Sequence, residues 1–158
     1  MTDEGLAKAV QAVGAEVALD VSLFLPDDET HFDPISAALG LGATLVIAFI
    51  DGVMEGMKGE VRSLGRRVGA RIAHRLASFV PDAPAPSTAE MTTAAQEAAD
   101  GLSALPPNER IEVNQLVEGE LAGYLHARGM TAKRANAVAA KVRDEIAATI
   151  TSTGEASP

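Results

Sequence analysis

An uninterrupted apolar run at residues 35–50 constrains this chain more than any other feature. Its sequence is ISAALGLGATLVIAFI, which has no charge and no strongly hydrogen-bonding side chain beyond Ser36 and Thr44. Such a run has to leave water, either in a protein core or in lipid. At roughly 1.5 Å per residue the helix reaches about 24 Å, whereas a bilayer core is about 30 Å thick. The run alone is therefore too short to span a membrane.

Extending the helix to Met57 supplies the missing length but brings in two acids, Asp51 and Glu55, on one helical face. An acid at the bilayer centre costs about 2.5–3.5 kcal/mol, while each Leu, Ile, Val or Phe returns about 0.3–0.6 kcal/mol. Two interpretations stay open: 35–57 is the buried central helix of a soluble bundle, which its length favours slightly, or it spans a membrane. Asp51 and Glu55 are candidate buried or interfacial charges. They pair with arginines in the simpler hypothesis and line a pore or oligomer axis in the other.

The residues that follow form a basic amphipathic helix. Its apolar positions recur every three or four residues, as on one helical face: Met57, Val61, Leu64, Val68, Ile72, Leu76 and Phe79. The basic patch lies mostly off that face: Lys58, Arg62, Arg66, Arg67, Arg71 and Arg75. The rest of the chain carries seven bases against twenty-one acids. We therefore expect the patch to meet acidic segments of this chain or of a second copy, or else an anionic membrane surface.

Nucleic acid is disfavoured as a partner, because the net charge is −9 and no aromatic residues are interleaved with the bases. Lys133, Arg134, Lys141 and Arg143 would suit a DNA-reading helix, but the helix before them is acidic.

Two glycine pairs have the GxxxG spacing that lets helix backbones approach closely. They form a candidate interface with neighbouring apolar residues: Gly52, Gly56, Gly65, Gly69, Val61, Leu64, Val68 and Ile72. The simpler interpretation is that they are ordinary small residues in a tight core. A break near 56–59, where the apolar and basic halves meet, is also expected.

Small and aliphatic side chains dominate the composition, with only five aromatic residues, which favours closely packed helices over a sheet. A first helix carries Leu6, Val10, Val13 and Val17 on one face, and we expect it to continue to Pro26. After the Pro-rich segment we expect three more helices: one opened by Ser87, one capped by Asn108 and ended by Gly129, and one begun by Thr131.

The predicted fold is all-α: a helical bundle around a long glycine-containing, apolar-to-basic central helix or helix pair, with a C-terminal helical hairpin. We divide the chain into an N-terminal helical region at 1–80, a Pro-rich linker at 81–87, a C-terminal helical region at 88–150 and a disordered tail at 151–158.

No catalytic motif is visible. The chain has no cysteine, no nucleophile elbow and no phosphate-binding loop, and its three histidines lack a second ligand at helical spacing. The acids Glu118 and Glu120 are two apart, so they are most simply solvated surface. We therefore expect no catalytic, cofactor-binding or metal site, which disfavours an enzyme without excluding one.

The function that the sequence favours is a small non-catalytic assembly, scaffold or adaptor protein. It self-associates or docks a protein partner through residues 35–79, in the cytoplasm or at the cytoplasmic membrane. The alternative is a single-span or pore-forming membrane effector that uses the same segment. A ligand-binding or enzymatic bundle with an unreadable site is the third hypothesis.

Overall fold

The computed structural model describes residues 3–24, 34–57, 64–77 and 88–155. Within these ranges the chain forms six α-helices, one short 3-10 helix and no strand, which confirms the all-α prediction. The elements are α1 (Asp3–Val17), η1 (Val21–Phe24), α2 (Pro34–Gly56), α3 (Leu64–Ala77), α4 (Thr88–Ser103), α5 (Pro107–Ala127) and α6 (Ala132–Glu155).

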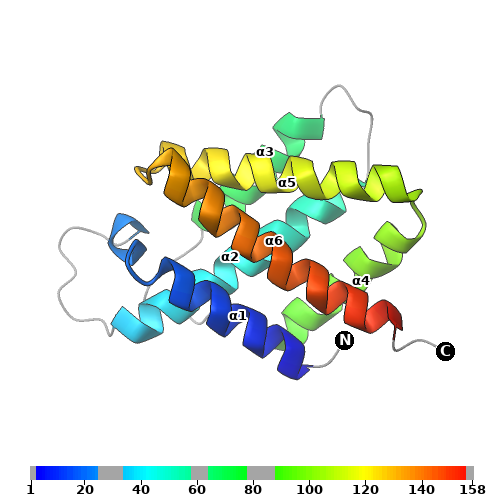
Figure 1. The fold of residues 1–158 in the computed structure, drawn as a ribbon, viewed down its shortest axis with the longest axis horizontal. Coiled ribbons are helices and arrows are strands. Elements are labelled where there is room, and N and C mark those ends of the chain that lie inside the picture. The colour runs from blue at the N-terminus through cyan, green and yellow to red at the C-terminus, as the bar shows by residue number, and fades with distance from the viewer. Residues whose placement is uncertain (1–2, 25–33, 58–63, 78–87, 156–158) are drawn as a thin grey trace.

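Helix α2 is the centre of the bundle, in contact with every other α-helix (Figure 1). Its residues from 45 to 53 are all buried, on every side of the helix. A helix that is apolar all round must be enclosed on all sides, and here the other helices enclose it. The prediction of a helical bundle around this segment is confirmed.

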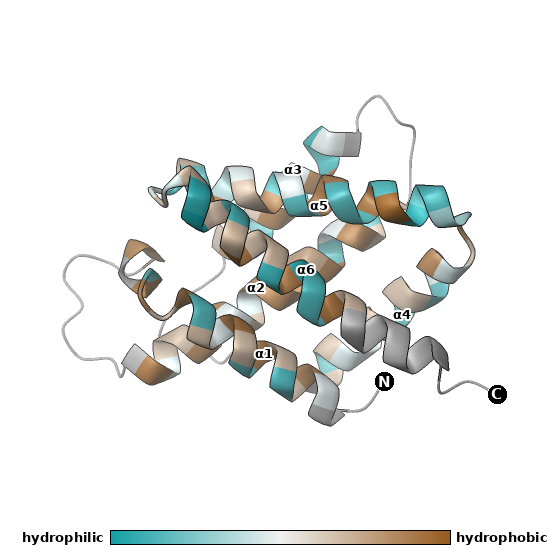
Figure 2. Ribbon diagram, in the orientation of Figure 1, coloured by the Kyte–Doolittle hydropathy of each residue, from teal (hydrophilic) through white to brown (hydrophobic). Residues whose placement is uncertain are grey.

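The described residues between 34 and 77 form a helix pair. α2 ends at Gly56 and α3 begins at Leu64, and the two helices pack against each other. On α3, Val68, Ile72 and Leu76 are buried in the core. The opposite side of α3 is polar (Figure 2). The amphipathic stripe predicted from spacing is therefore an internal packing face along this helix.

The expected continuation of the first helix to Pro26 is wrong, because α1 ends at Val17. The Asp20 amide donates to the Val17 carbonyl at 2.9 Å, which closes a turn, and η1 follows. After this turn Val21 and Phe24 lie in the core, whereas Leu19 within the turn is 90% exposed. Arg128 holds η1 in place, since its Nε donates to the Leu23 carbonyl and its guanidinium lies 5.5 Å from the Phe24 ring centroid.

Helices α5 and α6 form the predicted C-terminal hairpin (Figure 1). Gly129, at φ +124°, ends the first arm, and the Thr131 hydroxyl caps the second by accepting the Arg134 amide at 3.2 Å.

The predicted Asn108 cap is wrong, because α5 already begins at Pro107, whose fixed φ suits a first helical position. α6 extends to Glu155, past the end expected at residue 150. The predicted linker at 81–87 lies outside the described residues.

Candidate interaction surface

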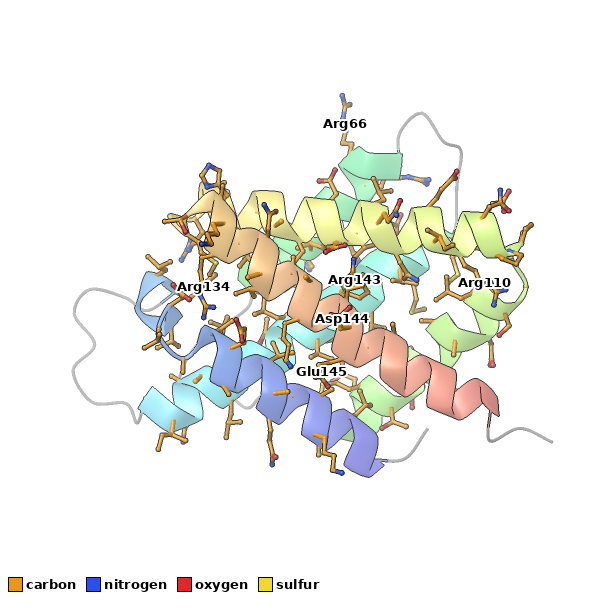
Figure 3. The ribbon with its side chains drawn as sticks, in the orientation of Figure 1. Arg66, Arg110, Arg134, Arg143, Asp144 and Glu145 are labelled. Atoms are coloured by element: carbon orange, nitrogen blue, oxygen red, sulfur yellow. The ribbon has the colours of Figure 1, made fainter. Side chains whose placement is uncertain are left out.

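The described part of the basic patch divides between the surface and the core. Arg66 and Arg71 are exposed, and Arg66 projects away from the bundle in Figure 3. Arg67 is half-buried, with Nε and Nη2 shielded from solvent and without a hydrogen-bond partner among the described residues. Lys58 and Arg62 lie outside the described residues. We call Arg66, Arg67 and Arg71 the basic side of α3.

Arg75 is the member of the patch that faces inward. Its Nε donates to Oδ2 of Asp51, which joins α3 to the central helix. Asp51 is 7% exposed, one of the few polar residues in the core. A buried carboxylate needs a partner of opposite charge, and Arg75 supplies it. Glu55, one turn further along α2, is half-buried and makes no ion pair with another described residue.

The glycines of the candidate interface lie at contacts between helices of this one chain. A Cβ on Gly52 would stand 2.9 Å from Cγ1 of Val117, and one on Gly56 would stand 3.1 Å from Cγ1 of Val113. These glycines therefore let α5 approach the central helix closely.

The second glycine pair and the apolar interface residues are also engaged within the chain. Gly65 and Gly69 on α3 accommodate the carboxylate of Glu120 from α5. Val68 and Ile72 are fully buried. Val61 and the side chain of Leu64 lie outside the described residues. Use of this set between two chains stays a prediction.

Two arginine clusters fasten the bundle. The sequence spacing did not predict the residues with which these arginines pair. Arg134 on α6 donates to Oε1 of Glu16 at 2.6 Å, to Oδ2 of Asp20 at 2.7 Å and to the Glu16 carbonyl. The hydrogen bond to Asp20 contributes most to raising the pKa of Arg134. This cluster ties α6 to the end of α1.

Arg143 on α6 joins the two arms of the hairpin. Its Nη1 donates to Oε2 of Glu118 at 2.6 Å, and its guanidinium also contacts Asp144. The hydrogen bond to Asp144 is the main cause of a raised Arg143 pKa. Glu118 is therefore a partner in α5–α6 packing rather than solvated surface.

An acidic face on α4 was also missed. Glu90, Glu97 and Asp100 are all exposed, while Met91, Ala95, Ala98 and Leu102 are buried on the other side. The helix contains no lysine or arginine. The signal was available in the sequence, because spacings of seven and three place the acids on one helical face.

Other kinds of site have little support in the described ranges. No group of three or more His, Asp or Glu residues there is placed to hold a metal ion. One described helix, Ile35–Gly56, is long and apolar enough to cross a bilayer, and 83% of its most apolar window is buried in the bundle. Comparison with protein-family models, with curated proteins and with solved structures finds no match.

Proposed function

We propose that this protein is a non-catalytic helical adaptor that docks an acidic partner through the basic side of α3. The observation that carries the proposal is the division of the patch: Arg75 is neutralised by Asp51, whereas Arg66 and Arg71 are exposed. Neither of these two makes an ion pair with another described residue.

The packing of the 35–79 segment narrows the surface through which it can dock. α2 is buried from residue 41 to residue 53, and the apolar face of α3 is used against the core. Ile35 and Leu39 near the start of α2 are exposed but uncharged, so the solvent-facing side of α3 is the charged surface that this segment offers to a partner. Its positive charge on a chain of net charge −9 favours orientation of an acidic surface toward this side during encounter.

The test compares the size of the tagged full-length chain in unfractionated cell extract. We expect it to elute above the mass of one chain at physiological salt and to shift to that mass in the double variant Arg66→Glu/Arg71→Glu. The matched control is Lys8→Glu/Lys133→Glu, which makes the same charge change at exposed residues of α1 and α6. Elution of the unmodified chain as a single chain would reject the proposal.

The apolar length of α2 favours a second candidate, a membrane effector that inserts this helix. Ile35–Gly56 is long enough to span a bilayer. Insertion requires the surrounding helices to separate and the Asp51–Arg75 pair to break, which opposes it. An alkaline carbonate wash of membranes from expressing cells decides: retention of the chain in the pellet supports insertion, and recovery in the supernatant rejects it.

A further inference from the structure

We infer that the acidic partner is a second copy of this chain, which presents the acidic face of α4 to the basic side of α3. This inference rests on the proposed docking function and identifies the partner that binds the basic side of α3. Charge complementarity between the two surfaces carries it. The basic side of α3 exposes Arg66 and Arg71, and the acidic face of α4 exposes Glu97 and Asp100 with no base on the same helix.

The acidic face of α4 is open to solvent at Glu97 and Asp100. Both residues are exposed, while the helix is held by Met91, Ala95, Ala98 and Leu102 on its buried side. The Gln96 amide donates to Oδ1 of Asp100 at 3.2 Å, which orients that carboxylate along the surface.

One chain does not bring these two surfaces together. α3 packs mainly on α2 and α5, whereas α4 packs on α1, α2 and α6. In Figure 1 α3 lies at the top of the bundle and α4 at the lower right. Two chains can pair the surfaces without rearrangement. If both patches of one copy meet the opposite patches of the same second copy, the assembly is a two-fold dimer; if they meet two different copies, it is a ring or an open filament.

The expected contact is weak and sensitive to salt. Exposed ion pairs contribute little individually, and ions screen them. The overall charge of −9 also makes copies repel one another at low ionic strength. We therefore expect association to depend on concentration and to disappear at about 1 M salt, where the screening length is about 3 Å.

Charge exchange between the two surfaces tests the pairing in purified full-length protein, by light scattering and sedimentation. Arg66→Glu/Arg71→Glu makes both surfaces acidic, and Glu97→Lys/Asp100→Lys reverses the acidic face of α4. Each variant alone should associate about tenfold or more weakly than the unmodified chain, because like charges then meet. An equimolar mixture of the two variants should recover association, because opposite charges face each other again. Circular dichroism checks that both variants remain helical.

The outcomes separate this inference from the proposed function. Loss in each variant with recovery on mixing, and no loss in Lys8→Glu/Lys133→Glu, supports pairing between copies. Absence of recovery overturns it. A purified chain that stays monomeric, while its complex in extract still depends on Arg66 and Arg71, overturns the inference but leaves the docking function standing with another partner. Flotation of that monomer with phosphatidylserine vesicles would assign the basic side of α3 to lipid. Absence of any complex both from extract and from the concentrated purified protein would reject both.

Discussion

Gly42 on the central helix lies against Gly14 on α1, so close that a Cβ at residue 42 would stand 2.8 Å from the Gly14 nitrogen. The Val10 carbonyl oxygen lies 2.9 Å from the same position. The atoms on the α1 side are backbone, so no side chain can rotate away to make room. α1 is therefore held against the core at a separation that only glycine permits at residue 42.

Gly42→Ala should lower the free energy of unfolding by about 1–3 kcal/mol, because an added methyl forces two backbones apart. Gly119→Ala and Gly123→Ala on α5 are the controls, since both positions are exposed with nothing within 4 Å of an added Cβ. Removing glycine from an open helical site should raise stability by about 0.4–1 kcal/mol. Urea denaturation of the three variants measures these differences. A stabilising effect of Gly42→Ala would contradict the close approach of α1 and α2.

The contact between Gly52 and Val117 can be tested with a second substitution that compensates for the first. Gly52→Ala should destabilise by about 1–3 kcal/mol, because its Cβ would stand 2.9 Å from Cγ1 of Val117. The double variant Gly52→Ala/Val117→Ala removes the clash, so its cost should be smaller than the sum of the two single costs by about 1 kcal/mol. A double-mutant cycle from denaturation curves gives the coupling. Additive effects would mean that Gly52 does not face Val117.

The ion pair between the central helix and α3 gives a third prediction. Arg75→Leu leaves Asp51 buried without its partner, which should cost about 2–4 kcal/mol. Asp51→Leu/Arg75→Leu removes both charges and should recover most of that loss, as apolar replacement of buried pairs often does. The exposed Arg71→Leu is the matched control and should change stability by less than about 0.5 kcal/mol. Thermal unfolding at neutral pH compares the variants.

Periodicity located the helices well where one face is strongly apolar. Val68 and Ile72 lie in the core as their spacing predicts, and Gly129 ends a helix in the left-handed conformation. The end of α1 was missed, because Val17, Val21 and Phe24 fit a continuing helical stripe. Tertiary contacts of η1 with Arg128 outweigh that local preference.

The spacing of residues along the sequence could not predict which residues of different helices pair with each other. An arginine partner for Asp51 was expected, but several arginines follow it in sequence, and only the crossing of α2 and α3 selects Arg75. The close backbone approach of α1 and α2 was missed for a similar reason, because Gly14 and Gly42 belong to different helices and form no GxxxG pair in sequence. A glycine on the apolar face of the first helix, between Val10 and Val17, was the available signal.

The Arg134 cluster gives the last prediction, which concerns local rather than global stability. Arg134→Ala removes the hydrogen bonds to Glu16 and Asp20 that fasten the end of α1 to α6. We expect backbone amides near the end of α1 to exchange with solvent hydrogen faster by about tenfold or more, while α5 amides keep their protection. Hydrogen exchange followed by mass spectrometry resolves the two regions.

Arg134→Lys and a pH series complete this test. Lysine keeps the charge but cannot donate to both carboxylates with a planar fork, so exchange in α1 should be intermediate between Arg134→Ala and the unmodified chain. Asp20 raises the already high pKa of Arg134, so the stability due to the charged guanidinium is fully present below its unfolded-state pKa. That contribution is lost only as pH rises through the higher folded-state value. Loss of α1 protection between neutral and mildly alkaline pH, after correction for the intrinsic exchange rate, would show that another contact holds this helix.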